Sequence, residues 1–385
     1  MDSAKHMRFL PPSDEGGGPL AVEGENLLSN PSQTPYLHSI CSSFVHKFHV
    51  IKWYNITNET TTLREVCTMI FEKQVVAMYK QGLHSRCDDN GTAYYFSPSD
   101  FPDIAYRPYY FKSSMGHTLR GYFYWYPQPI KNRLIVFDHG FGGGHRSYMK
   151  EIERLCKAGY TVFSYDHTGC MESEGASPNG IVQSLRDLDD CIKALRADTK
   201  YENVEISVVG HSWGGFSTLN ITALHSDIKK IVAIAGFVSA ETLVNSYFGG
   251  FMAPYRKAIM NLERESNPEY IDFNAVDTLK RANTKALLIY SDNDKMCTHA
   301  NYEALYNGLS GKSGITFLLE HNKGHNPNYT EDAVMYLGRY QAQLNKMKKK
   351  LTTPKAKEDF VNSWDWDRMT AQDNNVWEKI IEFLK

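Results

Sequence analysis

The sequence predicts an α/β fold with a doubly wound, mostly parallel sheet and a small helical lid insertion. Three observations support this prediction. Short, nearly continuous apolar runs are typical of strands that are buried on both faces. Helical stretches lie between several of these runs. The repeated order of strand, helix and strand is that of a doubly wound domain. The six apolar runs occupy residues 134–137, 161–165, 206–209, 231–234, 286–290 and 315–319.

The composition of the 385 residues is that of a globular protein, because 42% are hydrophobic and 22% are charged. The net charge of −2 favours no nucleic-acid partner. No apolar run reaches the roughly 18–20 residues that span a bilayer. The seven cysteines are scattered without a CxxC pair, which predicts reduced thiols and no zinc site. Since residues 1–30 lack the pattern of a secretory leader, we expect a cytoplasmic protein.

The N-terminal part of the chain is predicted to precede the sheet. Residues 1–60 are expected to be a flexible or unassigned segment, since they are rich in turn formers at first and match no clear pattern later. Residues 61–103 are predicted to be a helical extension, because apolar residues recur at near-helical spacing between 62 and 81. Two strand-like runs then flank the turn at 113–116 and predict a hairpin.

The α/β domain is predicted over residues 104–385 and contains two insertions. Residues 239–283 are aromatic and helical, and we expect them to form a lid over the ligand crevice. Residues 329–368 are expected to be a C-terminal helical insertion, whose basic run at 346–350 is interpreted as a solvated helix end. The helices expected between and after the strands are residues 147–158, 181–195 and 375–384.

The most specific motif is the G-x-S-x-G run at residues 210–214. It follows a predicted strand and opens a predicted helix, which is the context of a nucleophile elbow. Ser212 must then project above the sheet from a strained turn, where larger flanking residues would clash with the neighbouring strand and helix. A chance glycine-rich turn is the alternative, and the strand–turn–helix context favours the nucleophile.

A serine nucleophile needs a base and an orienting acid. After a nucleophile elbow, the acid precedes the histidine in the chain. Two acids and two histidines lie just past strand ends, so the acid is Asp292 or Asp294 and the base is His321 or His325. Four other histidines are expected to line or underlie the site without acting as the base: His139, His145, His167 and His211.

The oxyanion hole requires two backbone N–H donors. One is expected from Trp213, the residue after the nucleophile. The other is expected from residues 138–144, which we call the oxyanion loop, because its glycines allow the backbone to turn amides inward.

These motifs together resemble the α/β-hydrolase superfamily over about residues 104–326 and the last helix, with lysophospholipase-like and serine-aminopeptidase-like branches as the nearest match in style. Residues 139–143 resemble its His-Gly oxyanion motif, which implies that Phe141 supplies the second amide. Residues 166–175, here called the Asp166 loop, resemble its D-x-R-G-x-G-x-S-E-G loop. Thr168 replaces the arginine of that motif, and Met171 replaces a glycine.

The resemblance also favours one acid and one base. The acid of the family stands three residues after a Gly-like position, which Ser291 occupies here, and this favours Asp294. The base of the family follows a glycine, which favours His325. The triad that the resemblance implies is therefore Ser212, Asp294 and His325.

A serine nucleophile in this superfamily implies acyl transfer through an acyl-serine intermediate. The expected activity is hydrolysis of a small-molecule carboxylic ester, without a metal or cofactor. One alternative is an aminopeptidase acting on short peptides with the same triad, in which the lid acids Glu263, Glu265 and Glu269 would hold the substrate amine. A further alternative is a non-catalytic binding protein with the same fold.

Overall fold

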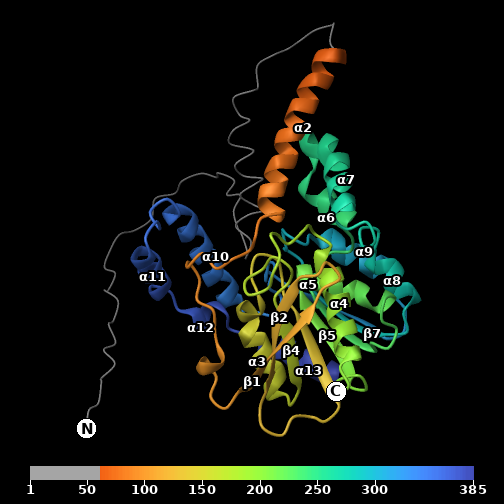
Figure 1. Cartoon of the computed structure of the whole chain (residues 1–385), viewed down its shortest axis with the longest axis vertical. Coiled ribbons are helices and arrows are strands. Elements are labelled where there is room, and N and C mark those ends of the chain that lie inside the picture. The colour runs from red at the N-terminus through yellow and green to blue at the C-terminus, as the bar shows by residue number, and fades with distance from the viewer. Residues whose placement is uncertain (1–60) are drawn as a thin grey trace, which may run out of the picture.

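Eight strands pair into one sheet within residues 61–385, which are the residues that the computed structural model describes (Figure 1). The predicted segment 1–60 lies outside the described residues. The strand order is β1-β2-β4-β3-β5-β6-β7-β8. β1 and β2 form the predicted hairpin, β2 pairs antiparallel with β4, and the remaining pairs are parallel. The strands are β1 (Ala105–Lys112), β2 (Thr118–Trp125), β3 (Arg133–Asp138), β4 (Thr161–Tyr165), β5 (Glu205–His211), β6 (Lys230–Ile234), β7 (Lys285–Ser291) and β8 (Ile315–Glu320).

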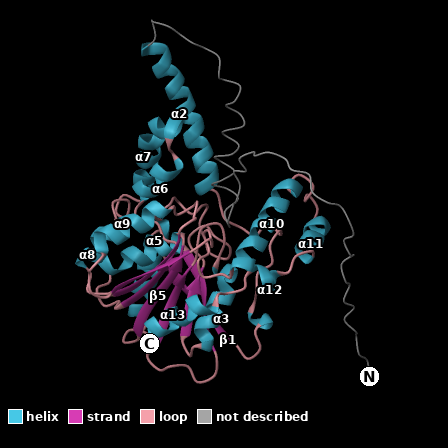
Figure 2. Cartoon of the chain, turned by 180° about the vertical axis from the view of Figure 1, so that it is seen from behind, coloured by secondary structure: helices cyan, strands magenta, loops and turns pink. Residues whose placement is uncertain are grey.

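The central strands are apolar on both faces because helices cover both sides of the sheet (Figure 2). Within β5, Val208 belongs to the core on one side and Val209 to the core on the other. The predicted fold class is therefore confirmed. One layer contains α4 (Gln183–Ala197), α5 (Trp213–Asn220), α8 (Ala275–Arg281) and α9 (His299–Leu309), and the other contains α3 (Met149–Lys157) and α13 (Asn374–Leu384).

A helical group projects from one end of the sheet (Figure 1). It consists of α2 (Thr61–Leu83), α6 (Ala240–Tyr247), η5 (Gly250–Tyr255) and α7 (Arg256–Ser266). The hydroxyl of Tyr79 in α2 donates to Glu263 Oε1 in α7 at 2.6 Å, so the extension and the insertion after β6 are joined. α2 has 23 residues, yet no helix within residues 61–385 is both long and apolar enough to cross a membrane.

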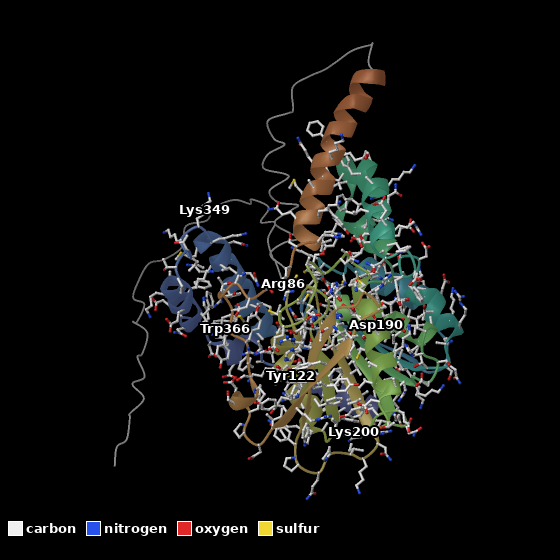
Figure 3. All side chains as sticks on the ribbon, in the orientation of Figure 1. Arg86, Tyr122, Asp190, Lys200, Lys349 and Trp366 are labelled. Carbon is white, nitrogen blue, oxygen red and sulfur yellow. The ribbon has the colours of Figure 1, made fainter. Side chains whose placement is uncertain are left out.

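A second helical group lies on the other side of the molecule and has its own small core. It consists of α10 (Glu331–Met347), α11 (Pro354–Asn362) and α12 (Trp366–Met369). Leu337, Tyr340 and Phe360 are buried in this core. The basic run begins in the last turn of α10, and its lysines are exposed, with Lys349 at the outer edge in Figure 3.

Candidate active site

Ser212 occupies the sharp turn between β5 and α5. Its φ of 58° and ψ of −111° are strained for a residue with a side chain. The turn is held because the Ser212 amide donates to the Ile234 carbonyl at 2.8 Å. A Cβ at Gly210 would collide with the Gly214 carbonyl, and a Cβ at Gly214 would collide with the Asp138 carbonyl. The flanking glycines are thus needed for the close approach of strand, turn and helix.

The structure brings Ser212, Asp294 and His325 together. His325 Nε2 lies 2.7 Å from Ser212 Oγ, and His325 Nδ1 lies 2.8 Å from Asp294 Oδ2. The other carboxylate oxygen of Asp294 accepts bonds from the amides of Met296 and Cys297 at 2.7 and 3.1 Å. Both Asp294 and His325 are buried, whereas Ser212 is partly exposed. The three side chains therefore form a continuous hydrogen-bonded line that ends at a reachable hydroxyl.

The other two candidates form a separate pair at the surface. His321 Nδ1 lies 2.7 Å from Asp292 Oδ2, and the side chain of His321 is 74% exposed. The Asn322 amide also donates to Asp292 at 3.0 Å, so this aspartate forms hydrogen bonds with two successive residues of the loop after β8. The hydrogen bond from His321 lowers the pKa of Asp292. Asp292 thus binds a histidine other than the one that contacts Ser212.

A chain of hydrogen bonds fixes the oxyanion loop beside Ser212. The Gly140 amide donates to the Tyr148 hydroxyl at 3.1 Å, the hydroxyl donates to His211 Nδ1 at 2.9 Å, and His211 Nε2 donates to the His325 carbonyl at 2.8 Å. The ring of Phe141 packs edge-on against Trp213, with 5.2 Å between centroids. Within the described part of the chain, the amides of Phe141 and Trp213 donate to no protein group. Both remain available to an oxyanion.

The four histidines that were expected to line or underlie the site are buried, and each forms hydrogen bonds. His139 Nδ1 donates to the Gly140 carbonyl at 2.8 Å, and His145 lies 2.8 Å from Asp166. Burial lowers the pKa of His139 and of His211 to about 3, so both rings are neutral near pH 7.

His167 differs from His139 and His211 in the direction of its pKa shift. Burial opposes its protonation, but Asp138 at 3.1 Å and Asp187 at 3.3 Å raise the pKa of His167 to about 9. The ring is therefore a buried cation between two carboxylates. It lies directly under the site, with its centroid 4.7 Å from that of Trp213.

Arg86 supports the Asp166 loop and was not found from the sequence. Its guanidinium donates to the carbonyls of Ser173 and Gly175 at 2.9 and 2.8 Å, and also to Met171. Figure 3 shows Arg86 where the end of α2 meets the loops above the sheet. Met171 has a φ of 41°, which keeps a glycine-like backbone at the position where the motif has glycine. No sequence signal connects Arg86 with a loop more than eighty residues away.

Glu263 is fully buried, so its carboxylate is not exposed to a substrate amine. It accepts bonds from the Tyr79 hydroxyl at 2.6 Å and from the Ile181 amide at 2.8 Å, with His84 Nε2 at 3.4 Å. The Ile181 carbonyl in turn accepts the indole N–H of Trp213 at 2.7 Å. Glu263 thus links α2 and α7 and, through Ile181, Trp213. The side chains of Glu265 and Glu269 are exposed.

A cavity of about 150 Å³ adjoins the oxyanion loop. Its lining includes residues 140–143 and, from the C-terminal helical group, Leu337, Tyr340 and Trp366. Asn90 and residues 92–96 also line it. The lining is mostly apolar and aromatic, which suits a hydrocarbon or aryl group.

Comparison with known proteins finds one family model and several relatives that match part of the chain. Residues 129–271 match the family model of serine aminopeptidase S33. The chain is 31% identical to the monoglyceride lipase of Rattus norvegicus over 94 residues, which is 24% of this chain and 30% of that protein. It is 26% identical to the proline iminopeptidase of Saccharolobus solfataricus over 151 residues, which is 37% of this chain and 47% of that protein. The chain thus spans less than half the length of these curated relatives.

An esterase of Pyrococcus furiosus is similar in structure, with a TM-score of 0.49 and 16% sequence identity, and the match covers 69% of this chain and 98% of the esterase. The sheet and the sharp turn at Ser212 define a doubly wound α/β fold, and residues 129–271 are similar to a hydrolase family. The chain has the α/β-hydrolase fold, and its residues 129–271 resemble the α/β-hydrolase superfamily.

Proposed function

We propose that this hydrolase cleaves carboxylic esters through an acyl-serine intermediate at Ser212. The observation that carries the proposal is the hydrogen-bonded line from Asp294 through His325 to the Ser212 hydroxyl. Asp294 accepts the Nδ1–H of His325, which leaves Nε2 free to take the proton of Ser212 as the hydroxyl attacks the ester carbonyl. His325 then protonates the leaving alcohol, and water releases the acid by the reverse sequence.

The oxyanion of the tetrahedral intermediate would bind to the amides of Phe141 and Trp213. Both amides lie in segments that other contacts hold: Gly140 is bonded to Tyr148, and the Trp213 indole is bonded to Ile181. Fixed donors need little reorganisation during the reaction, and losing one typically costs about 2.7–4 kcal/mol.

The cavity beside the oxyanion loop supports a substrate with a short apolar group. Its volume is about 150 Å³. A cavity of about that volume accepts a group the size of benzene. We propose that the acyl chain of the ester enters this cavity, so that medium acyl chains are preferred over long ones.

The aminopeptidase alternative rests on the family model that matches residues 129–271. A peptidase of this kind needs a carboxylate to hold the substrate amine. Glu263, the buried acid among the three proposed, is already bonded to Tyr79 and Ile181. This engagement favours the ester hydrolase.

The test is hydrolysis of p-nitrophenyl esters from acetate to palmitate by the wild type and by Ser212→Ala. We expect the highest rate at a medium chain length and loss of the rate in the variant. Aminoacyl p-nitroanilides and a fluorophosphonate probe are run in parallel. Cleavage of the anilides alone would support the peptidase. Absence of both hydrolysis and labelling would overturn the enzyme proposal in favour of a binding protein.

A further inference from the structure

Two cysteines from distant parts of the sequence lie opposite each other beside the oxyanion loop. The Cys87 amide donates to the Gly169 carbonyl, and the Met171 amide donates to the Cys87 carbonyl, both at 2.9 Å. These bonds make Cys87 and Cys170 directly paired residues of a parallel bridge. Paired strands lie about 4.8 Å apart. That spacing falls within the Cα separation of about 4.4–6.8 Å that a disulfide requires.

The two thiols are reduced and differ in exposure. Both are free cysteines; Cys170 is fully buried, whereas Cys87 is partly exposed. The thiol of Cys170 and, to a smaller extent, the amide of Gly142 lower the pKa of Cys87. The contact with Cys87 and burial raise the pKa of Cys170. Cys87 is therefore the thiol that solvent reaches and that ionises first, which is the usual character of a redox-sensitive cysteine.

The backbone around the pair is held in place by other contacts. Arg86 bonds to the carbonyls of Ser173 and Gly175 on the Asp166 loop. The Asp166 side chain accepts bonds from the His145 amide at 2.8 Å and the Glu172 amide at 3.0 Å. The two sulfurs are thus presented to each other by a scaffold that does not depend on a bond between them.

We propose that Cys87 and Cys170 are a modification site, at which an oxidant of the peroxide class closes a disulfide that thiol reductants reopen. Peroxide transfers one oxygen to the Cys87 thiolate, giving a sulfenic acid and hydroxide. The Cys170 sulfur then attacks the Cys87 sulfur, the S–S bond forms as the S–O bond breaks, and water leaves with the Cys170 proton. The two sulfurs lose two electrons, and these reduce the peroxide.

The disulfide would also act on the site, an expectation that rests on the proposed function. An S–S bond is about 2.05 Å long, which is much shorter than a contact between two thiols. Closing it draws the Cys87 sulfur toward Cys170 and so alters the contact of that sulfur with the Gly142 amide in the oxyanion loop. Because this loop carries the Phe141 amide, we expect slower ester hydrolysis in the oxidised protein.

The test treats the full folded chain with a small excess of hydrogen peroxide, blocks remaining thiols with N-ethylmaleimide and maps the peptides by mass spectrometry. We expect one cross-linked peptide pair joining Cys87 to Cys170, a mass loss of about 2 Da, and reversal by dithiothreitol. Cys156→Ser is the matched control, since Cys156 is a buried thiol in the opposite core and its loss should leave the cross-link unchanged.

Cys87→Ser and Cys170→Ser should both abolish the cross-link, and Cys87→Ser keeps the test valid if the buried substitution fails to fold. Oxidation of Cys87 to sulfinic acid without a cross-link, or a cross-link to another cysteine, would overturn the proposal. Ester hydrolysis should fall at least threefold on oxidation of the wild type and stay constant in Cys87→Ser. An unchanged rate with complete disulfide would refute the effect on the site, whereas a wild type without any esterase activity but with the cross-link would refute only the proposed function.

Discussion

Two aspartates two residues apart have different surroundings. Asp294 is buried and bonded to His325, whereas Asp292 is bonded to the exposed His321. The sequence offers both acids at the end of the same strand. The distinction arises because the chain after Ser291 turns inward, where the amides of Met296 and Cys297 receive the carboxylate of Asp294. The pair forms a natural comparison between a buried acid and a surface acid.

Asp294→Asn should lower kcat by roughly 10⁴-fold, because the amides of Met296 and Cys297 hold the asparagine oxygen, so that its NH2 group donates to Nδ1 of His325 and the wrong tautomer results. Asp292→Asn is the matched control and should leave kcat within about twofold, since an exposed pair contributes little. Steady-state hydrolysis of the preferred p-nitrophenyl ester measures both. Equal losses in the two variants would contradict the assignment of the acid.

Glu151 gives the protein a specific pH dependence. It lies in α3 and is 2% exposed, and burial raises its pKa from 4.5 to about 7. The native state therefore binds the proton more tightly than the unfolded chain. The contribution of this group to stability is complete below about pH 4.5 and is lost as the pH rises through about 7.

We predict that Glu151→Gln removes this dependence. Between pH 4.5 and 7 the free energy of unfolding of the wild type should fall relative to that of the variant by at most about 3 kcal/mol. Urea denaturation at several pH values measures the difference. The raised pKa of His167 acts in both proteins and cancels in the comparison. Parallel pH curves for the two proteins would show that Glu151 is ionised in the native state.

At the scale of elements, a buried carboxylate of α7 forms a hydrogen bond with α2. Glu263 accepts bonds from Tyr79 of α2 and from the Ile181 amide. The sequence predicts the helix in α2 and a lid insertion after β6, since both depend on local periodicity. It does not predict that they meet, because a contact between residues separated by 184 positions leaves no local pattern.

Tyr79→Phe should destabilise the protein by roughly 1–3 kcal/mol, because it removes the hydroxyl that donates to Oε1 of the buried Glu263 carboxylate at 2.6 Å. Tyr94→Phe is the matched control. Its hydroxyl donates to Asp100 at 2.7 Å at an exposed site, where water replaces the lost bond. Thermal unfolding of both variants measures the effect. If Tyr94→Phe lowered the stability as much as Tyr79→Phe, the buried hydrogen bond would contribute no more to stability than the exposed one.

At the scale of the whole molecule, the C-terminal helical group and the oxyanion loop both line the cavity. The helical group has its own core. The Tyr340 hydroxyl of this group donates to the Thr92 carbonyl at 2.8 Å and so connects the group with the segment 90–96. The proposed acyl site therefore depends on three parts of the chain that are far apart in sequence.

Leu337→Phe should fill part of this cavity and lower kcat/KM for hexanoate relative to acetate by roughly tenfold, since one or two methylene groups in an apolar pocket have an effect of that size. Met335→Phe is the matched control, because Met335 lies in the same helix with its side chain 59% exposed. The ratio of kcat/KM values for the two esters is the readout. An unchanged ratio in Leu337→Phe would place the acyl chain elsewhere.

The sequence by itself determined the α/β class, the strands, the elbow turn and the candidates for acid and base. These depend on local periodicity, on glycines at a close approach and on positions at strand ends. The family resemblance favoured Asp294 over Asp292, and the packing of the chain then brought Asp294 to His325. Packing also buried Glu263 between two helices, placed Arg86 on the Asp166 loop and set Cys87 opposite Cys170. These are contacts between distant residues, and their geometry is fixed by how the elements pack rather than by any pattern within one element.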